Sequence, residues 1–238
     1  QLTRPPGHKG HRLPASDQAR MLTSPVFIFS PARSGSTLLR AVLGSHSQLY
    51  APPELPLMHM RVKAETKWIQ RSMRELQYTN EDLDHLLWDR VLADLLERSS
   101  KQRIVVKTPS NVLIWSRIAE IWPDAQFIFL LRHPAAAVAS LQKSWDPAWQ
   151  WAGTDSSEKV TASALRYMLK VEEARHGLKG HTVRYEEITG DPEATILKLC
   201  PFLKIAYKPD MLEYVQFANF KVATGPAAPS QNIRSGTT

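Results

Sequence analysis

Seven consecutive residues, Pro31-Ala32-Arg33-Ser34-Gly35-Ser36-Thr37, carry the groups that a phosphate-binding loop needs. Gly35 lets the backbone approach a ligand closely, and Ser36 and Thr37 supply hydroxyls. A helical apolar pattern starts at Ser36, so the first backbone amides of that helix, with its dipole behind them, would face a bound anion. A Walker A loop has lysine directly after its second glycine, whereas here the cation, Arg33, stands two residues before Gly35. The loop is therefore predicted to bind a phosphorylated ligand without the Walker A spacing.

Short β-branched and aromatic runs alternate with longer helical patterns, which predicts an α/β fold around this loop. The predicted strands are Val26–Ser30, Arg103–Lys107, Gln126–Leu131 and His181–Tyr185, and the predicted helices are Ser36–Leu43, Asn80–Glu97, Asn111–Ile121, Ala135–Lys143, Val160–Ala174 and Pro192–Leu199. This order indicates a P-loop-like, mainly parallel central sheet flanked by helices, with the ligand crevice at the carboxyl ends of the strands. Lys107 ends the second strand and is expected to project into that crevice.

Two stretches are longer than a simple crossover requires, and we interpret them as insertions. Residues 52–100 contain three prolines and a charged helical region, and they are predicted to form a helical cap over the crevice. Trp145, Trp149 and Trp151 lie in a loop with Pro and Gly, where they either line an acceptor pocket or anchor the loop by packing. Residues 1–24 are rich in Pro, Gly and basic side chains and predict an N-terminal arm or linker, which leaves 25–238 as one domain.

The composition is that of a globular protein, and its positive charge suits an anionic ligand, nucleic acid included, without identifying one. The 238 residues are 43% hydrophobic, and 30 Lys and Arg against 23 Asp and Glu give a net charge of +7. The single cysteine, Cys200, excludes an internal disulfide and is compatible with a reducing compartment. No stretch reaches the ~20 apolar residues of a membrane-spanning helix. The metal-binding spacings H-E-x-x-H and C-x-x-C and the hydrolase motif G-x-S-x-G are absent. We therefore expect a soluble, cytoplasmic protein that has no metal and does not insert into membranes.

The loop resembles a known donor-binding motif. The stretch Ser30–Leu38 is similar to the 5′-phosphosulfate loop of sulfotransferases that use 3′-phosphoadenosine 5′-phosphosulfate (PAPS). The arginine form of this loop, followed by LLRAVLGSHSQLYAPPEL, resembles bacterial sulfotransferases, including those inside polyketide assembly lines, and the tyrosylprotein enzymes. The resemblance implies that the 5′ end of PAPS is held by Arg33, Ser34, Gly35, Ser36, Thr37 and Leu38.

Three later segments extend this resemblance in the order that the family has them. FIFLLRHPAAAVASL is similar to the segment that binds the 3′-phosphate, which implies this role for Arg132 and Ser140. HTVRYEEITGDPEATILKLCPFL is similar to the segment whose tyrosine contacts the adenine, here Tyr185. NIRSG resembles the basic loop that closes over the 3′-phosphate, with Arg234, Ser235 and Gly236, although Ser235 replaces a frequent lysine. Relatives usually continue past this point, so the domain is expected to be truncated at its C-terminus.

The resemblance also implies the chemistry, which is transfer of a sulfuryl group to an acceptor hydroxyl. Such a transfer needs a base for the hydroxyl proton and positive charge beside the departing phosphate oxygen. Lys107 and Arg33 are the candidates for that charge, so no metal is implied. Cytosolic relatives carry a histidine base in K-T-H, but this chain has Lys107-Thr108-Pro109, and the matching base in tyrosylprotein-type relatives is a glutamate, here Glu54. His46 and His59 are lesser candidates, and His59 lies in an apolar segment that would face the acceptor.

Other functions remain open on the sequence alone. A nucleotide kinase or NTPase with an atypical phosphate loop would have the same broad architecture and would bind ATP with magnesium. A non-catalytic nucleotide-binding scaffold would keep the loop without transferring any group. For the sulfotransferase, the expected partner is a hydroxyl on a small molecule or on a chain tethered to a carrier protein, as in bacterial secondary metabolism, and not a nucleic acid.

Overall fold

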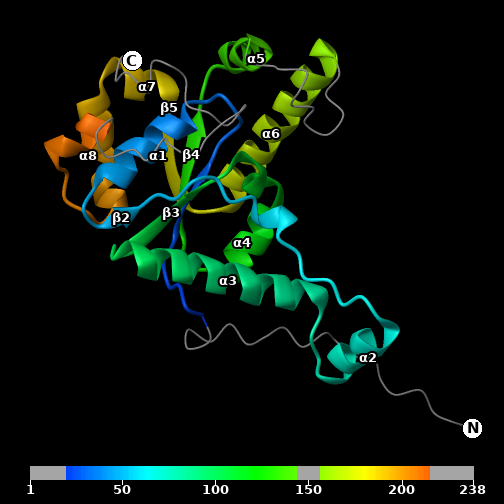
Figure 1. Cartoon of the computed structure of the whole chain (residues 1–238). Helices are drawn as coiled ribbons and strands as arrows, with labels where there is room; N and C mark the ends of the chain where they lie inside the picture. Colours follow the sequence, from blue (N-terminus) through cyan, green and yellow to red (C-terminus); the bar gives the residue numbers. More distant parts are fainter. Residues whose placement is uncertain (1–19, 144–155, 215–238) are drawn as a thin grey trace, which may run out of the picture.

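A parallel β-sheet forms the centre of the molecule. The computed structural model describes residues 20–143 and 156–214. The sheet consists of β1 (Val26–Phe29), β2 (Leu49–Tyr50), β3 (Arg103–Lys107), β4 (Gln126–Leu131) and β5 (Gly180–Arg184), in the order β2-β3-β1-β4-β5. Every neighbouring pair is parallel, with helices on both faces (Figure 1). The predicted α/β fold with a mainly parallel sheet is therefore confirmed.

Strand β1 lies at the point where the chain changes direction across the sheet. Val26 pairs with Val105 of β3 on one side and with Gln126 of β4 on the other. The chain thus builds β2 and β3 to one side of β1 and then crosses to build β4 and β5 on the other. In open α/β sheets, ligands bind at the carboxyl ends of the strands beside such a switch. The loop at residues 30–35, which leaves β1, occupies this position.

The helices agree with the sequence pattern in place and differ in detail at several ends. They are α1 (Ser36–Ser45), α2 (Lys67–Glu75), α3 (Asn80–Ser99), α4 (Trp115–Ile121), α5 (Pro134–Lys143), α6 (Ser157–Gly177), α7 (Tyr185–Gly190) and α8 (Pro192–Leu203). Three short 3₁₀ helices are η2 (Leu57–His59), η3 (Pro109–Ile114) and η4 (Pro209–Glu213). None of the helices within the described ranges is both long and apolar enough to cross a bilayer.

Two predictions about these elements were wrong in detail. The helix predicted over 111–121 is α-helical only from Trp115, and its first four residues belong to the 3₁₀ helix η3. The reason is that the side chain of Asn111 forms hydrogen bonds with the backbone of Leu55 and Leu57. Asn and Ser favour such local alternatives to helix hydrogen bonding. Tyr185 was predicted to end a strand but begins α7, because the carboxylate of Glu187 accepts a hydrogen bond from the backbone amide of Arg184 (3.2 Å) and caps the helix.

Alternation along the strands divides the core into two parts. Successive side chains of a strand point to opposite faces. Val26 and Ile28 pack with residues of α1, α8 and η4, including buried Cys200. Phe27 and Phe29 face the other way and pack with residues of α3, α4 and α6. The sheet is therefore buried on both faces, which explains why its strands are almost continuously apolar.

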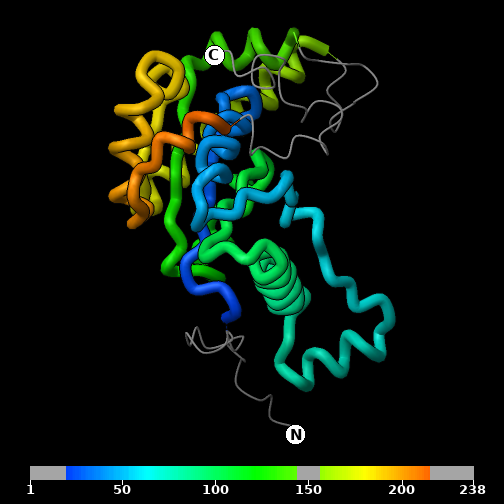
Figure 2. Tube along the Cα trace, turned by 60° about the vertical axis from the view of Figure 1, so that its left-hand side comes forward, coloured from blue at the N-terminus to red at the C-terminus, as the bar shows by residue number. Residues whose placement is uncertain are grey.

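The inserted segment 52–100 contains one core helix and one projecting helix. The α3 residues Trp88 and Leu92 are fully buried in the second part of the core, so α3 covers a face of the sheet. In contrast, α2 has no buried residue and lies apart from the sheet in both views (Figures 1 and 2). That residues 52–100 form a cap over the crevice stays a prediction.

The described end of the predicted N-terminal arm is docked. The carboxylate of Asp89 on α3 accepts hydrogen bonds from the backbone amides of Met21 (2.6 Å) and Leu22 (3.2 Å) and from the indole of Trp122 (2.8 Å). Leu22 is buried in the core. Residues 20–24, which belong to the predicted arm, thus contact the core, and the rest of the predicted arm, residues 1–19, lies outside the described residues.

Candidate functional site

The loop between β1 and α1 has the backbone of an anion-binding site. Arg33 (φ 63°) and Gly35 (φ 83°) both adopt the left-handed conformation, and Gly35 is the N-cap of α1. No side chain of the described residues caps this helix, so the first amides of α1 are available to a ligand. The hydroxyl of Ser34 is buried and has no hydrogen-bond partner among the described residues. An anion would satisfy these donors.

Gly35 is closely covered by the ring of Tyr185. A Cβ atom at Gly35 would lie 2.2 Å from Cδ2 of Tyr185. The guanidinium of Arg132 lies over the same Tyr185 ring, 4.2 Å from its centroid. It also donates a hydrogen bond to the carbonyl of Arg33 (2.7 Å). The end of β4 and the start of α7 therefore hold the loop in its left-handed turn.

We expect Gly35→Ala to lower both stability and ligand affinity. The left-handed conformation alone costs an L-residue about 1–2 kcal/mol, and the new methyl group must displace the Tyr185 ring. Thermal unfolding measures the stability. Calorimetric titration with adenosine 3′,5′-bisphosphate, the nucleotide that PAPS would leave after sulfuryl transfer, measures the ligand affinity. Gly190→Ala is the matched control, since no atom lies within 4 Å of its added Cβ. Equal behaviour of the two variants would contradict this account of the loop.

Two arginines and a serine form a positively charged group on one side of the loop. The Nε of Arg33 donates to the hydroxyl of Ser140 on α5 (3.3 Å), and Arg132 bonds the backbone carbonyl of Arg33. Burial, and then the charge of Arg132, lower the pKa of Arg33 from its ordinary value, while Tyr185 opposes this. The Nε of Arg132 is buried without a hydrogen-bond partner among the described residues. Two neighbouring guanidiniums, one of them with an unpartnered buried Nε, suit a multiply charged anion.

Lys107 and Glu54 form a second charged group on the other side of the loop. The Lys107 ammonium is in contact with the Glu54 carboxylate and lies 3.4 Å from the hydroxyl of Thr37 on α1. The Lys107 side chain is 2% exposed, whereas that of Glu54 is 24% exposed. Burial lowers the pKa of Lys107, and the charge of Glu54 opposes that shift. A buried cation beside a helix N-terminus, paired with a carboxylate that solvent can reach, has the parts for proton transfer next to a bound anion.

The segment that carries Glu54, residues 51–62, is held from its start to its end, and we call it the Glu54 segment. At its start, Nη1 of Arg40 donates to the carbonyls of Ala51 (3.2 Å) and Pro52 (3.0 Å). In its middle, the amide of Leu55 donates to the Thr108 hydroxyl (2.8 Å). Further along, the amide of Leu57 donates to the Asn111 side chain (3.0 Å). Residues just after β3, the strand that ends in Lys107, therefore position the chain around Glu54.

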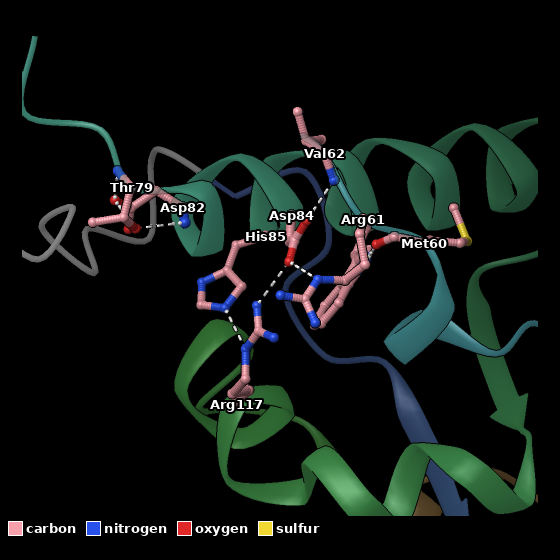
Figure 3. A network of polar contacts seen from close by, with 9 residues as sticks. Met60, Arg61, Val62, Thr79, Asp82, Asp84, His85 and Arg117 are labelled. Carbon is pink, nitrogen blue, oxygen red and sulfur yellow. Dashed lines mark hydrogen bonds and ion pairs between the residues drawn. The ribbon is translucent and has the colours of Figure 1, made fainter. Parts of the chain in front are cut away.

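A buried carboxylate fixes the far end of the Glu54 segment (Figure 3). Asp84 of α3 is fully buried and accepts hydrogen bonds from the Val62 amide (2.7 Å) and from Nη2 of Arg117 (3.3 Å). Arg61 forms an ion pair with the same carboxylate at 2.7 Å. The indole of Trp88 donates to the carbonyl of Met60 (2.7 Å). The end of the segment is thus tied to α3 and α4.

A histidine and an aromatic ring complete this network. The Nε of Arg117 donates to Nε2 of His85 (3.3 Å), and its guanidinium lies 4.7 Å from the centroid of the Trp88 ring. Burial and the charge of Arg117 lower the pKa of His85, which favours the neutral ring that can accept this bond. Arg117 is therefore held by three residues of α3, which are Asp84, His85 and Trp88.

The predicted site residues fall into these two groups, with some exceptions. Lys107, Glu54 and Thr37 come together, as do Arg33, Ser140, Arg132 and Tyr185, while Arg33 and Lys107 have no direct contact among the interactions described. Leu38 is buried in the core, so only its backbone faces the loop. Residues Trp145, Trp149, Trp151, Arg234, Ser235 and Gly236 lie outside the described residues.

The two histidine candidates do not join either group. His59 is exposed at the end of η2. His46 is the C-cap of α1, at the opposite end of the helix from Thr37, and its ring bonds the Ala206 carbonyl (3.1 Å) and the Gln48 amide (3.2 Å). His46 therefore has a structural role. Within the described part of the chain, no three His, Cys, Asp or Glu side chains are grouped as metal ligands.

The residues that hold the Glu54 segment were not predicted from the sequence. Arg40 lies in an apolar helix one turn after Thr37, and a charge in that position was a signal that it has a buried partner. Thr108 and Asn111 follow the strand that ends in Lys107, but nothing in their spacing named Leu55 and Leu57 as their partners.

Comparison with known sequences finds a family model that covers most of this chain and several relatives. A profile of the sulfotransferase family matches residues 25–209. An uncharacterized protein of Aquifex aeolicus is 28% identical over 202 residues, which are 80% of this chain and 26% of that protein. The nodulation protein NoeE of Sinorhizobium fredii is 32% identical over 133 residues, 50% of this chain and 31% of NoeE. A protein-tyrosine sulfotransferase of Drosophila melanogaster is 24% identical over 205 residues, 82% of this chain and 40% of that protein. The chain spans less than half the length of these relatives.

Comparison with solved structures shows a shared fold. The sulfotransferase domain from the curacin biosynthetic pathway has a TM-score of 0.62 and 22% identity, with 90% of this chain and 83% of that domain covered. The sulfotransferase domain of the Synechococcus olefin synthase has a TM-score of 0.58 and 22% identity, with coverages of 90% and 84%.

Proposed function

Because the chain belongs to the sulfotransferase family, we propose that it transfers a sulfuryl group from PAPS to an acceptor hydroxyl and leaves adenosine 3′,5′-bisphosphate. The observation that carries this proposal is the pair of Lys107 and Glu54 next to Thr37, at the uncapped N-terminus of α1. A cation for the departing oxygen and a carboxylate for the hydroxyl proton thus lie beside one anion-binding loop.

The described residues suit a donor that is charged at both ends. The open amides of α1 and the unpartnered Ser34 hydroxyl fit its 5′ phosphosulfate. Arg132, whose Nε has no described hydrogen-bond partner, and Ser140 fit the 3′-phosphate. Tyr185 packs against Gly35 and offers a ring that contacts the adenine.

The chain's own residues divide the work of the reaction. Glu54 accepts the proton of the acceptor hydroxyl as its oxygen attacks the sulfur. The bond between the sulfur and the bridging oxygen breaks, and this oxygen leaves with the phosphate. Lys107 donates a hydrogen bond to this oxygen, and Thr37 helps to orient the Lys107 ammonium. Arg33 adds positive charge from the other side of the loop. The donor supplies the sulfuryl group itself, and in-line placement of the two reactants is the task of the loop and the Glu54 segment.

Calorimetric titration of the protein with adenosine 3′,5′-bisphosphate and with ATP tests the donor. We expect binding of the bisphosphate to be at least about tenfold tighter, because a hydrogen bond to a charged group contributes about 1.5–3 kcal/mol and the 3′-phosphate has two candidate donors. Preference for ATP with magnesium would favour a kinase or NTPase. Absence of binding to either nucleotide would favour a non-catalytic module in which the loop remains only as part of the core.

A matched variant assigns this preference to one residue. Arg132→Met should reduce the affinity for the bisphosphate towards that for adenosine 5′-monophosphate, which lacks the 3′-phosphate. The affinity for the monophosphate itself should change much less. An equal loss for both ligands would argue against a 3′-phosphate contact at Arg132.

The acceptor is proposed only as a class. The name of the curacin structure refers to a biosynthetic pathway and that of NoeE to nodulation. These names support a natural-product hydroxyl, on a small molecule or tethered to a carrier protein, in a bacterial secondary metabolism. A cytoplasmic location is part of the same proposal.

A further inference from the structure

We propose that Arg40 is a positioning residue that holds Glu54 in place for proton transfer, a role that rests on the proposed function of Glu54 as the base. Arg40 lies on α1 three residues after Thr37, so the helix that presents the anion-binding amides also carries this guanidinium. Through it, the donor loop and the proposed base are attached to the same rigid element.

The hydrogen bonds of Arg40 act directly before Glu54. Its Nη1 donates to two successive carbonyls, those of Ala51 (3.2 Å) and Pro52 (3.0 Å). Pro52 and Pro53 then fix φ at two positions, and therefore few free torsions separate the bound carbonyls from Glu54. Because Arg40 holds these two carbonyls in place, it also restrains the backbone of Glu54.

The charge of Arg40 acts on the same carboxylate. Burial lowers the pKa of Arg40, and the negative charge of Glu54 opposes that shift. Arg40 in turn lowers the pKa of Lys107, although less than burial does. The Glu54 carboxylate thus interacts with two cations, Lys107 in direct contact and Arg40 behind it. Arg40 thus adds positive charge on the side of Glu54 that carries the bound carbonyls.

The surroundings of Arg40 do not suit a residue whose only role is to stabilise the fold. Its Nε is buried without a hydrogen-bond partner among the described residues. A guanidinium that is partly desolvated and incompletely bonded is costly, and an apolar side chain at such a position is often neutral or stabilising. Thr108, Asn111 and Asp84 already hold the Glu54 segment after Glu54, and none of them carries a positive charge. Arg40 alone among these residues restrains the segment before Glu54.

Arg40→Met and Arg40→Lys, measured with the proposed donor and an accepted hydroxyl substrate, test the proposal. Misplacement of a reacting group by about 1 Å can cost about 10²-fold in rate, so we expect kcat of Arg40→Met to fall by about 10- to 100-fold. Arg40→Lys should recover part of the loss, because it keeps the charge but cannot bridge the carbonyls in the same way. The bisphosphate affinity should stay unchanged in both variants, since Arg33, Arg132 and Ser140 are not altered. Arg98→Met, at an exposed arginine of α3, is the control.

A double variant separates positioning from a general structural effect. If Arg40 acts through Glu54, adding Arg40→Met to Glu54→Gln should reduce kcat by less than about twofold further, because coupled residues are not additive. A further loss as large as in the wild-type background would overturn the proposal, as would an unchanged kcat in Arg40→Met. A loss of bisphosphate binding in Arg40→Met would also overturn it. If the wild-type protein binds no bisphosphate, the proposed function itself fails, which is a different result.

Discussion

Glu54→Gln is expected to lower kcat by about 10²- to 10⁴-fold, the usual contribution of a general base. Glutamine keeps the size of the side chain and can still accept a hydrogen bond from Lys107, but it cannot take up the proton of an acceptor hydroxyl. Single-turnover kinetics with the proposed donor would measure the chemical step directly. Bisphosphate binding should remain within about threefold of wild type, because Glu54 pairs with Lys107 and the residues proposed to hold the 3′-phosphate, Arg132 and Ser140, are not altered.

The control for this variant is Glu65→Gln, which removes an exposed carboxylate from the same inserted segment. Its kcat should equal that of the wild type. If Glu54→Gln retained full turnover, another group would have to be the base, and His59, at the end of η2, would be the next residue to replace.

Lys107→Met is expected to lower kcat by about 10²- to 10³-fold, the cost of losing one preorganised donor to a developing negative charge. The variant should still fold, because methionine fills much of the same buried volume and the remaining Glu54 carboxylate is accessible to water. Circular dichroism and thermal unfolding would check the fold, and steady-state kinetics the turnover. Lys198→Met, at an exposed lysine of α8, should leave both unchanged.

The pH dependence gives a second measure of Lys107. Burial lowers the pKa of this ammonium, so it loses its proton at a lower pH than an exposed lysine does. Turnover that needs the protonated form should therefore fall as the pH rises through this lowered pKa. In Lys107→Arg the guanidinium keeps its charge, and whatever activity remains should extend to higher pH. An identical alkaline limb in the two proteins would argue against Lys107 as the cation.

The sheet could be predicted from sequence because its strands are buried on both faces. Strands Arg103–Lys107 and Gln126–Leu131 were predicted with the observed ends, since a buried parallel strand is a continuous apolar run. Strand β2, only two residues long, has no pattern to detect. The start of α7 depends on the Glu187 carboxylate, a side-chain interaction that strand propensity does not contain.

The candidate site was predictable where a residue follows a strand and not where it depends on a remote partner. Lys107 was expected at the crevice because the carboxyl ends of parallel strands meet at one edge. The contact of Arg33 with Ser140 joins residues 107 positions apart, and the Arg40 bonds reach a segment that follows a turn and β2. Such pairings depend on how the crossovers pack, and one sequence does not contain that information.

The position of β1 in the middle of the sheet has an evolutionary consequence. The groups proposed for the nucleotide follow β1, β4 and β5, whereas Lys107 and the Glu54 segment follow β3 and β2, on the other side of β1. Under the proposed roles, mutations in the stretch between β2 and α3 leave the strand ends that carry Arg132, Ser140 and Tyr185 unchanged. The proposal thus implies that a lineage could exchange its acceptor while it keeps its donor, so that one sheet serves enzymes that differ in what they modify.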